Sequence, residues 1–170
     1  FSALLVLRTG DLQTAQAHLQ TAFRIAERSE RGLDFVGAQL YGAQAMMATD
    51  DRERRQALGK GEQILVGSAL SHNHFVFYDF AIQATLAGSQ WDNALRYCDA
   101  LESFVAAEPF PWADFIVARG RALALHGRGE RGAELRQDLV AMRDKAVASE
   151  MNFYLRDLDA ALGSLAVNPP

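Results

Sequence analysis

The sequence has one cysteine, few prolines and no long apolar run. The single cysteine, Cys98, excludes a disulfide bond within the chain. No apolar stretch approaches the roughly 20 residues that span a bilayer, and no signal peptide is evident, so we expect no membrane partner. Lysine and arginine number 17 against 21 acidic residues. The resulting net charge of −4 argues against a nucleic-acid partner, which would favour a basic face.

The overall composition is typical of a folded protein. Apolar residues make up 49% of the 170 residues and charged residues 22%, which excludes a disordered chain. A chain of this length folds as about one domain, and we expect a single domain over residues 1–170. The first residue, Phe1, lies within an apolar stretch, so we also expect the chain to be part of a longer protein.

Apolar residues recur at helical spacing along nearly the whole chain. In one such series each member has another three or four positions away; it consists of Leu12, Ala15, Leu19, Ala22, Phe23 and Ala26. Strict alternation of apolar and polar residues is scarce, and the strand-like run 75–78 continues at helical spacing, so no strands are expected. Short groups of glycine, proline and small polar residues separate the helices, because these residues satisfy or terminate helix ends. The sequence therefore predicts an all-α fold.

An internal repeat follows from three segments that share a glycine-containing turn and a small residue near the fourth position of the next helix. They are residues 8–15, 87–94 and 126–133, with a weaker copy at 50–57. We interpret the small residues as places where neighbouring helices approach closely. They lie 42, 37 and 38 positions apart and are Ala15, Ala57, Ala94 and Gly132. This pattern is similar to the tetratricopeptide repeat, with the best match in Gly10-Asp11-Leu12-Gln13-Thr14-Ala15.

The resemblance to tetratricopeptide repeats implies a right-handed superhelix of antiparallel helix pairs, roughly four in number. The first helices of the pairs would cover about 33–49, 74–88 and 111–126, and a capping helix would cover about 152–166. The end at Phe1 lacks a polar cap. We therefore expect either further repeats upstream or a homodimer contact there.

A narrower resemblance lies in residues 90–102 and 108–122, which include Gln90-Trp91-Asp92-Asn93-Ala94 and Pro109-Phe110-Pro111-Trp112. These runs look like the C-terminal helical-repeat region of large bacterial signalling proteins. In those proteins a class III adenylate or guanylate cyclase domain and an ATPase module precede the repeats. Neither the metal-binding carboxylates of the cyclase nor the phosphate loop of the ATPase is present in this sequence. The resemblance implies a non-catalytic part of a bacterial cytoplasmic protein.

Four short motifs suggest chemistry, and each has a plainer interpretation. The run 127–132 matches a dinucleotide-binding glycine pattern, but a predicted helix rather than a strand precedes it, so we interpret it as a turn. His72 and His74 lack a third metal ligand at a fitting spacing and are interpreted as solvated histidines at a helix start. Cys98 lies on an apolar stripe and is assigned to the core. A basic group interrupted by acids, assigned to a solvated helix face, consists of Arg52, Arg54, Arg55 and Lys60.

The inner surface of the helical array is the strongest candidate for function, because the first helix of each pair lines it. Aromatic side chains there would provide contact area, and polar ones would orient a bound partner. The predicted partner-binding residues are Tyr78, Asp79, Gln83, Trp112, Asp114 and Arg121. The alternative is that Tyr78 and Trp112 pack between helices, with Asp79 and Arg121 in solvent.

The sequence predicts a protein-interaction or regulatory module that is not an enzyme, because no nucleophile–base pair, metal set or phosphate loop is found. No catalytic, metal-binding or cofactor-binding residue is therefore assigned. The partner would be another protein, a peptide or another domain of the same chain. Two alternatives stay open. One is a small-ligand sensor with an apolar cavity rimmed by Tyr78 and Trp112, and the other is an all-α enzyme.

Overall fold

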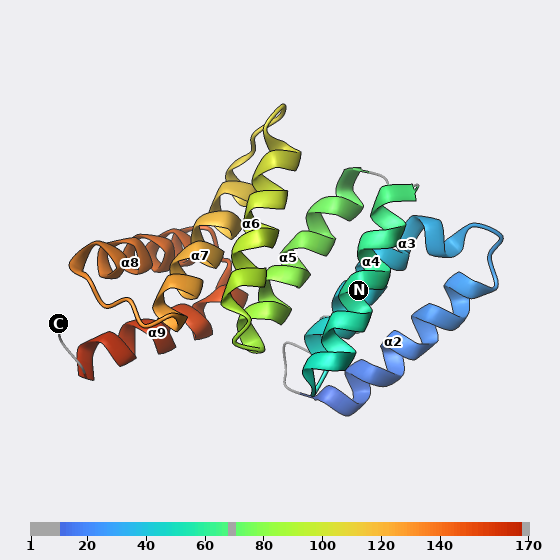
Figure 1. The fold of residues 1–170 in the computed structure, drawn as a ribbon, viewed down its shortest axis with the longest axis horizontal. Coiled ribbons are helices and arrows are strands. Elements are labelled where there is room, and N and C mark those ends of the chain that lie inside the picture. Colours follow the sequence, from blue (N-terminus) through green and yellow to red (C-terminus); the bar gives the residue numbers. More distant parts are fainter. Residues whose placement is uncertain (1–10, 68–70, 168–170) are drawn as a thin grey trace. The chain divides into compact units, whose positions relative to one another are not determined.

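The computed structural model describes residues 11–67 and 71–167, and these residues form α-helices and one 3-10 turn but no strand (Figure 1). The predicted all-α class is confirmed for this part of the chain, including the strand-like run 75–78, which is helical. The right-handed superhelix of antiparallel pairs stays a prediction. The homodimer contact expected at Phe1 lies outside the described residues.

The chain divides into two compact units, Phe1–Gly88 and Ser89–Pro170. The described helices of the first unit are α2 (Leu12–Glu27), α3 (Gly32–Met47), α4 (Asp51–Gly67) and α5 (Ser71–Ala87). Those of the second unit are α6 (Trp91–Val105), α7 (Pro111–Gly127), α8 (Ala133–Ala148), the 3-10 turn η1 (Asn152–Tyr154) and α9 (Leu155–Val167). The single domain expected over residues 1–170 stays a prediction.

The helix ends follow local sequence rules. Asp11 caps α2 by accepting a hydrogen bond of 3.0 Å from the amide of Thr14. Pro111 begins α7, where the missing proline N–H costs nothing because the first amides of a helix have no partner within it. The predicted helix starts at 33, 74 and 111 fall within three residues of the observed starts of α3, α5 and α7. Residues 152–166, predicted as one helix, form η1 and most of α9, and their capping role stays a prediction.

In the first unit, α3 packs against α2, α4 and α5. Two glycines let α5 lie close to its neighbours, because a side-chain carbon would collide with a ring at Gly61 and would be tightly crowded at Gly42. Gly42 of α3 faces Phe80, and Gly61 of α4 faces the buried ring of Phe77. This close packing fixes α3 as the central helix of the unit.

Two of the four small residues of the predicted repeat occupy equivalent places. Ala15 of α2 and Ala94 of α6 are completely buried. Each lies four residues after the N-cap of its helix, and its amide donates to the carbonyl of that cap residue, Asp11 or Gln90, over 3.0 Å. Ala15 and Ala94 thus share one helical position, and the repeat itself stays a prediction.

The other two small residues do not share that position. In α4 the position that corresponds to Ala15 and Ala94 is Arg54, whose amide donates to the carbonyl of Asp50. Ala57 is buried but lies three residues after Arg54. Gly132 is the N-cap of α8 and is exposed, with no atom within 4 Å of where a side-chain carbon would lie. The expectation that Gly132 lets two helices approach closely is wrong.

Arg54 also corrects the interpretation of the basic group on α4 as a solvated face. Its side chain is buried, and its guanidinium donates to Asp51 at 2.5 Å and to the carbonyl oxygen of Ala48 at 3.0 Å. The other members of the group, Arg52, Arg55 and Lys60, are exposed as expected. Arg54 is buried because it reaches the carbonyl end of α3, where a cation is favourable.

In the second unit, α7 packs against α6, α8 and α9. Arg119 of α7 is 1% exposed, donates to Asp157 of α9 at 2.8 Å and lies 4.8 Å from the ring centre of Tyr154. Cys98 is completely buried, and burial raises the pKa of its thiol to about 12. The assignment of Cys98 to the core is confirmed. The glycine run 127–132 joins α7 to α8, which confirms its interpretation as a turn.

Candidate functional site

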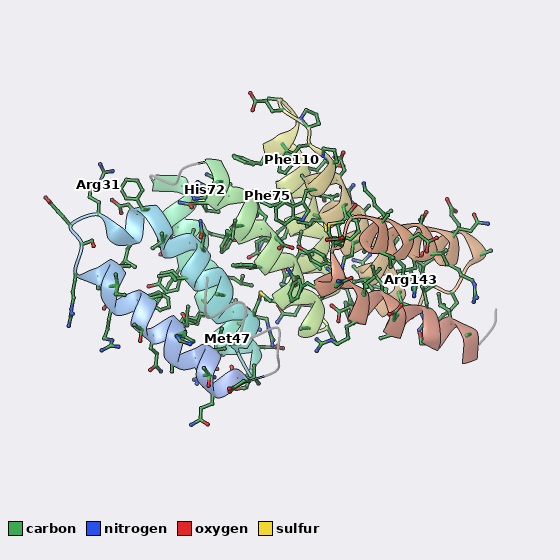
Figure 2. The ribbon with its side chains drawn as sticks, turned by 180° about the vertical axis from the view of Figure 1, so that it is seen from behind. Arg31, Met47, His72, Phe75, Phe110 and Arg143 are labelled. Atoms are coloured by element: carbon green, nitrogen blue, oxygen red, sulfur yellow. The ribbon has the colours of Figure 1, made fainter. Side chains whose placement is uncertain are left out.

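A groove of about 450 Å³ opens between α2, α3 and α4 of the first unit, and we call it the α2–α3–α4 groove. Apolar side chains form its floor, including Met47, which is 7% exposed and labelled in Figure 2. Polar, solvent-exposed side chains form its rim. The lining residues are Gln16, Leu19, Gln20 and Phe23 of α2; Gln44 and Met47 of α3, with its C-cap residue Ala48; and Glu53, Gln56, Ala57 and Lys60 of α4.

Helical periodicity explains why α2 and α4 each present one face to the groove. The lining residues of α2 lie at positions 16, 19, 20 and 23, and those of α4 at 53, 56, 57 and 60. Both sets have the spacing i, i+3, i+4, i+7, which places four side chains on one face of a helix. The C-terminal end of α3 lies between them and supplies the rest of the floor.

Four glutamines give the rim its chemistry: Gln16, Gln20, Gln44 and Gln56. All four are exposed, and none has a hydrogen-bond partner among the residues that the structure describes. A glutamine amide has two donor hydrogens and an acceptor oxygen, so it can bind both the N–H and the C=O groups of another chain. The rim therefore offers hydrogen bonds of both kinds above an apolar floor.

Two charged side chains of opposite sign line the groove, both from α4. Lys60 lies with its ammonium 5.4 Å from the ring centre of Tyr41, and that ring lies 5.0 Å from the ring of Phe23. Glu53 lies two helical turns before Lys60, in the first turn of α4. Within the described residues, neither Glu53 nor Lys60 forms an ion pair. The groove thus has an aromatic, cationic end and an acidic end.

Three of the six predicted partner-binding residues lie on α5. Asp79 is 6% exposed, and its carboxylate accepts a 2.8 Å hydrogen bond from the side-chain amide of Gln83, one turn later. Tyr78 is half-buried, with its ring 6.1 Å from that of His74. The structure therefore brings Asp79 and Gln83 together, with the carboxylate largely covered.

The other three predicted residues lie on α7, in the second unit. Trp112 is 49% exposed, and Asp114 is exposed. Arg121 donates to Glu102 at 2.8 and 2.9 Å and to Asp99 at 2.7 Å, so it holds α7 to α6. The hydrogen bonds from Arg121 lower the pKa of Glu102, because they stabilise the carboxylate. The structure pairs Arg121 with the acids of α6.

A buried polar residue that the sequence analysis missed lies between the two histidines of α5. Asn73 is completely buried, accepts a 2.5 Å hydrogen bond from the side chain of Gln39 and donates to the carbonyl of Phe35, which ties α5 to α3. His72 is exposed, as expected for a solvated histidine, whereas His74 is half-buried and burial lowers its pKa. The interpretation of His74 as solvated is wrong in this respect.

The sequence analysis also missed the α2–α3–α4 groove. The four-residue face of α2 and that of α4 are each visible as a helical pattern in the sequence, but nothing local indicates that the two faces border the same space. No family model, curated protein or solved structure matches the chain in comparisons with known proteins. Over its described residues the chain is an all-α protein with a polar-rimmed groove in its first unit. None of the described helices is long and apolar enough to cross a membrane.

Proposed function

We propose that this chain is a protein-interaction module without catalysis of its own, and that it binds an extended segment of a partner protein in the α2–α3–α4 groove. The observation that supports the proposal is the set of four rim glutamines without hydrogen-bond partners among the described residues. Every residue of an extended peptide, proline apart, carries one N–H and one C=O that need partners. The rim amides can supply both, while the floor covers apolar side chains of the segment.

The exposed rim favours a peptide over a small molecule. Small-ligand sites bury about 70–90% of the surface of their ligand. The rim glutamines, Glu53 and Lys60 are all solvent-exposed, so a ligand in the groove would keep one side in water. A peptide tolerates this arrangement, because its outward-facing side chains and backbone groups can be solvated.

The wider setting of the proposal is a bacterial cytoplasmic signalling protein of the kind that carries tetratricopeptide-like repeats beside cyclase and ATPase modules. Packing of α3 against three neighbouring helices supports a stack of helix pairs in the first unit. In the second unit, exposed Trp112 and Asp114 support a further contact region on α7. Tyr78, Asp79 and Gln83 of the first unit and Arg121 of the second stay predicted partner-binding residues, each within its own unit.

The test is a selection of binding peptides from a displayed library with the purified full chain, followed by titration calorimetry on synthetic peptides. The double variant Gln20→Ala, Gln56→Ala removes one amide from each side of the groove. We expect its affinity to fall about tenfold, because each lost hydrogen bond contributes about 0.5–1.5 kcal/mol and about 1.4 kcal/mol corresponds to a factor of ten.

The matched control is the double variant Gln13→Ala, Gln63→Ala, which changes two exposed glutamines of the same helices that do not line the groove. Its affinity should equal that of the unaltered chain. Equal losses in both double variants, or none in either, would place the peptide elsewhere. A thermal shift with a metabolite library, together with no selected peptide, would support the small-ligand sensor instead.

A further inference from the structure

We infer that the α2–α3–α4 groove selects a polyproline II segment that carries an acidic and a basic side chain three residues apart, the acidic one facing Lys60 and the basic one facing Glu53. This inference rests on the proposed function and specifies the ligand. Glu53 and Lys60 are the charged members of the lining set, and both come from one face of α4. The groove therefore fits a partner segment with the complementary pattern of charges.

The charges of both residues are available to a ligand. Arg54, which follows Glu53 in the sequence, is buried and pairs with Asp51 and the carbonyl of Ala48, so its charge is already compensated away from the groove. Lys60 contacts the face of Tyr41, an interaction that orients the ammonium without neutralising it. Within the described residues neither Glu53 nor Lys60 is held in an ion pair, so both can pair with a ligand.

The spacing of the two charged residues along α4 favours one of two extended peptide conformations. Seven residues at a rise of 1.5 Å separate the backbone positions of Glu53 and Lys60 by about 10.5 Å. In polyproline II, three residues make one turn with a rise of about 3.1 Å each, so side chains three residues apart share a face about 9.3 Å apart. In a β-strand, side chains on one face lie about 6.6 Å apart at two residues and about 13.2 Å apart at four. The polyproline II spacing is the closer match.

The rim amides fit the same conformation. A polyproline II segment has no internal hydrogen bonds, so the N–H groups of its non-proline residues and its carbonyls are available to the four glutamines. At the cationic end, Phe23 lines the groove, and its ring packs tilted at 56° against that of Tyr41, so one aromatic ring is available to contact a proline ring. The groove therefore provides charge, hydrogen bonds and an aromatic side chain.

The fixed order of the charges also sets the direction in which a segment binds. A peptide with its acid at the Lys60 end gains attraction at both ends. The reversed peptide places each charge beside one of like sign, which is unfavourable. Exposed charges are screened by salt, so the preference should weaken as ionic strength rises.

The experiment compares four proline-rich peptides by fluorescence anisotropy at low salt: a neutral peptide, and three that carry one glutamate and one arginine spaced by two, three or four residues. We expect the peptide with three-residue spacing to bind at least about fivefold more tightly than the other three. The charge-exchanged variant Glu53→Lys, Lys60→Glu should prefer the same peptide with glutamate and arginine exchanged. The single variants Glu53→Gln and Lys60→Met should each remove most of the preference for three-residue spacing. They provide the test if the charge-exchanged variant does not fold.

The control variant is Arg52→Glu, which changes an exposed charge of α4 outside the lining set and should leave the preference for spacing unchanged. If all four peptides bind equally and binding still depends on the rim glutamines, the inference is overturned while the proposed function stands. A strand-like preference for two- or four-residue spacing also overturns it. If no peptide binds in a way that depends on the rim glutamines, the proposed function itself fails.

Discussion

Arg54 of α4 donates a hydrogen bond of 3.0 Å to the carbonyl oxygen of Ala48, at the carbonyl end of α3. The same guanidinium lies against Gly88, which follows α5, so closely that a side-chain carbon at Gly88 would collide with it. A buried cation thus lies beside the carbonyl ends of two helices, where the helix dipoles favour positive charge. Arg54 thus joins α4 to the ends of α3 and α5.

Replacing Arg54 should destabilise the first unit. Arg54→Ala removes two hydrogen bonds and leaves the Ala48 carbonyl without its donor, so we expect the free energy of unfolding to fall by about 1–3 kcal/mol. Arg55→Ala, an exposed neighbour on the same helix, should change it by less than about 0.5 kcal/mol. Urea denaturation of both variants measures the difference, and equal midpoints would contradict the structural role of Arg54.

Gly88→Ala should have opposite effects in two backgrounds. In the unaltered chain the added carbon displaces the Arg54 guanidinium and lowers stability. In the Arg54→Ala background the collision is gone, and replacing glycine by alanine near a helix end is then neutral or stabilising by a few tenths of a kcal/mol. The double-mutant cycle reports the coupling directly. Additive effects would show that Gly88 and Arg54 do not contact each other.

Arg121→Ala should lower the thermal stability of the second unit, because Arg121 joins α7 to Asp99 and Glu102 of α6. If Arg121 were only a partner-binding residue, as the sequence predicts, its replacement would leave stability unchanged. The pKa of Glu102 is lowered in the folded state by its hydrogen bonds to Arg121. The Glu102 carboxylate therefore contributes fully to stability above its unfolded pKa of about 4.3. This contribution is lost as the pH falls through the folded pKa.

The pH dependence separates this ion pair from simple packing. The difference in melting temperature between the unaltered chain and Arg121→Ala should be largest near pH 6–7 and should shrink below about pH 4. The control is Arg136→Ala, which changes an exposed arginine of α8 that forms no ion pair within the described residues, and it should show no such trend. A difference that stays constant with pH would assign the effect to lost packing.

Arg119 should matter for its volume more than for its charge. Arg119→Met keeps most of the buried volume and replaces a costly buried charge, so its effect on stability should be small. Arg119→Ala leaves a cavity beside Tyr154 and should cost about 2–4 kcal/mol. Hydrogen exchange should show the loss first in α9, which Arg119 contacts through Asp157. Uniform loss over both units would contradict this.

Cys98 should be chemically inert in the folded chain. Burial raises its pKa to about 12, so almost no thiolate is present at pH 8, and the sulfur is inaccessible to reagents. A thiol-reactive dye should label the chain at pH 8 only after urea is added, with one equivalent per chain because Cys98 is the single cysteine. Rapid labelling without urea would show that the core around Cys98 opens readily.

The sequence by itself determined the helices. Asp11, Pro111 and the glycine run 127–132 act within a turn or two of their own positions, so the start of α2, the start of α7 and the turn before α8 could be predicted from neighbouring residues. The same holds for the apolar stripe that buries Cys98, because helical periodicity is a local property.

Only the tertiary structure decided which of the outward-facing polar residues acquire partners. Arg54 is buried because α3 and α5 end beside it, Asn73 because Gln39 and Phe35 lie opposite, and Arg121 is paired because α6 presents two acids. The rim glutamines of the groove come from three helices and become a site only where those helices meet. Such contacts join residues far apart in the chain, and periodicity and capping carry no information about them, since both depend on neighbours within a few residues.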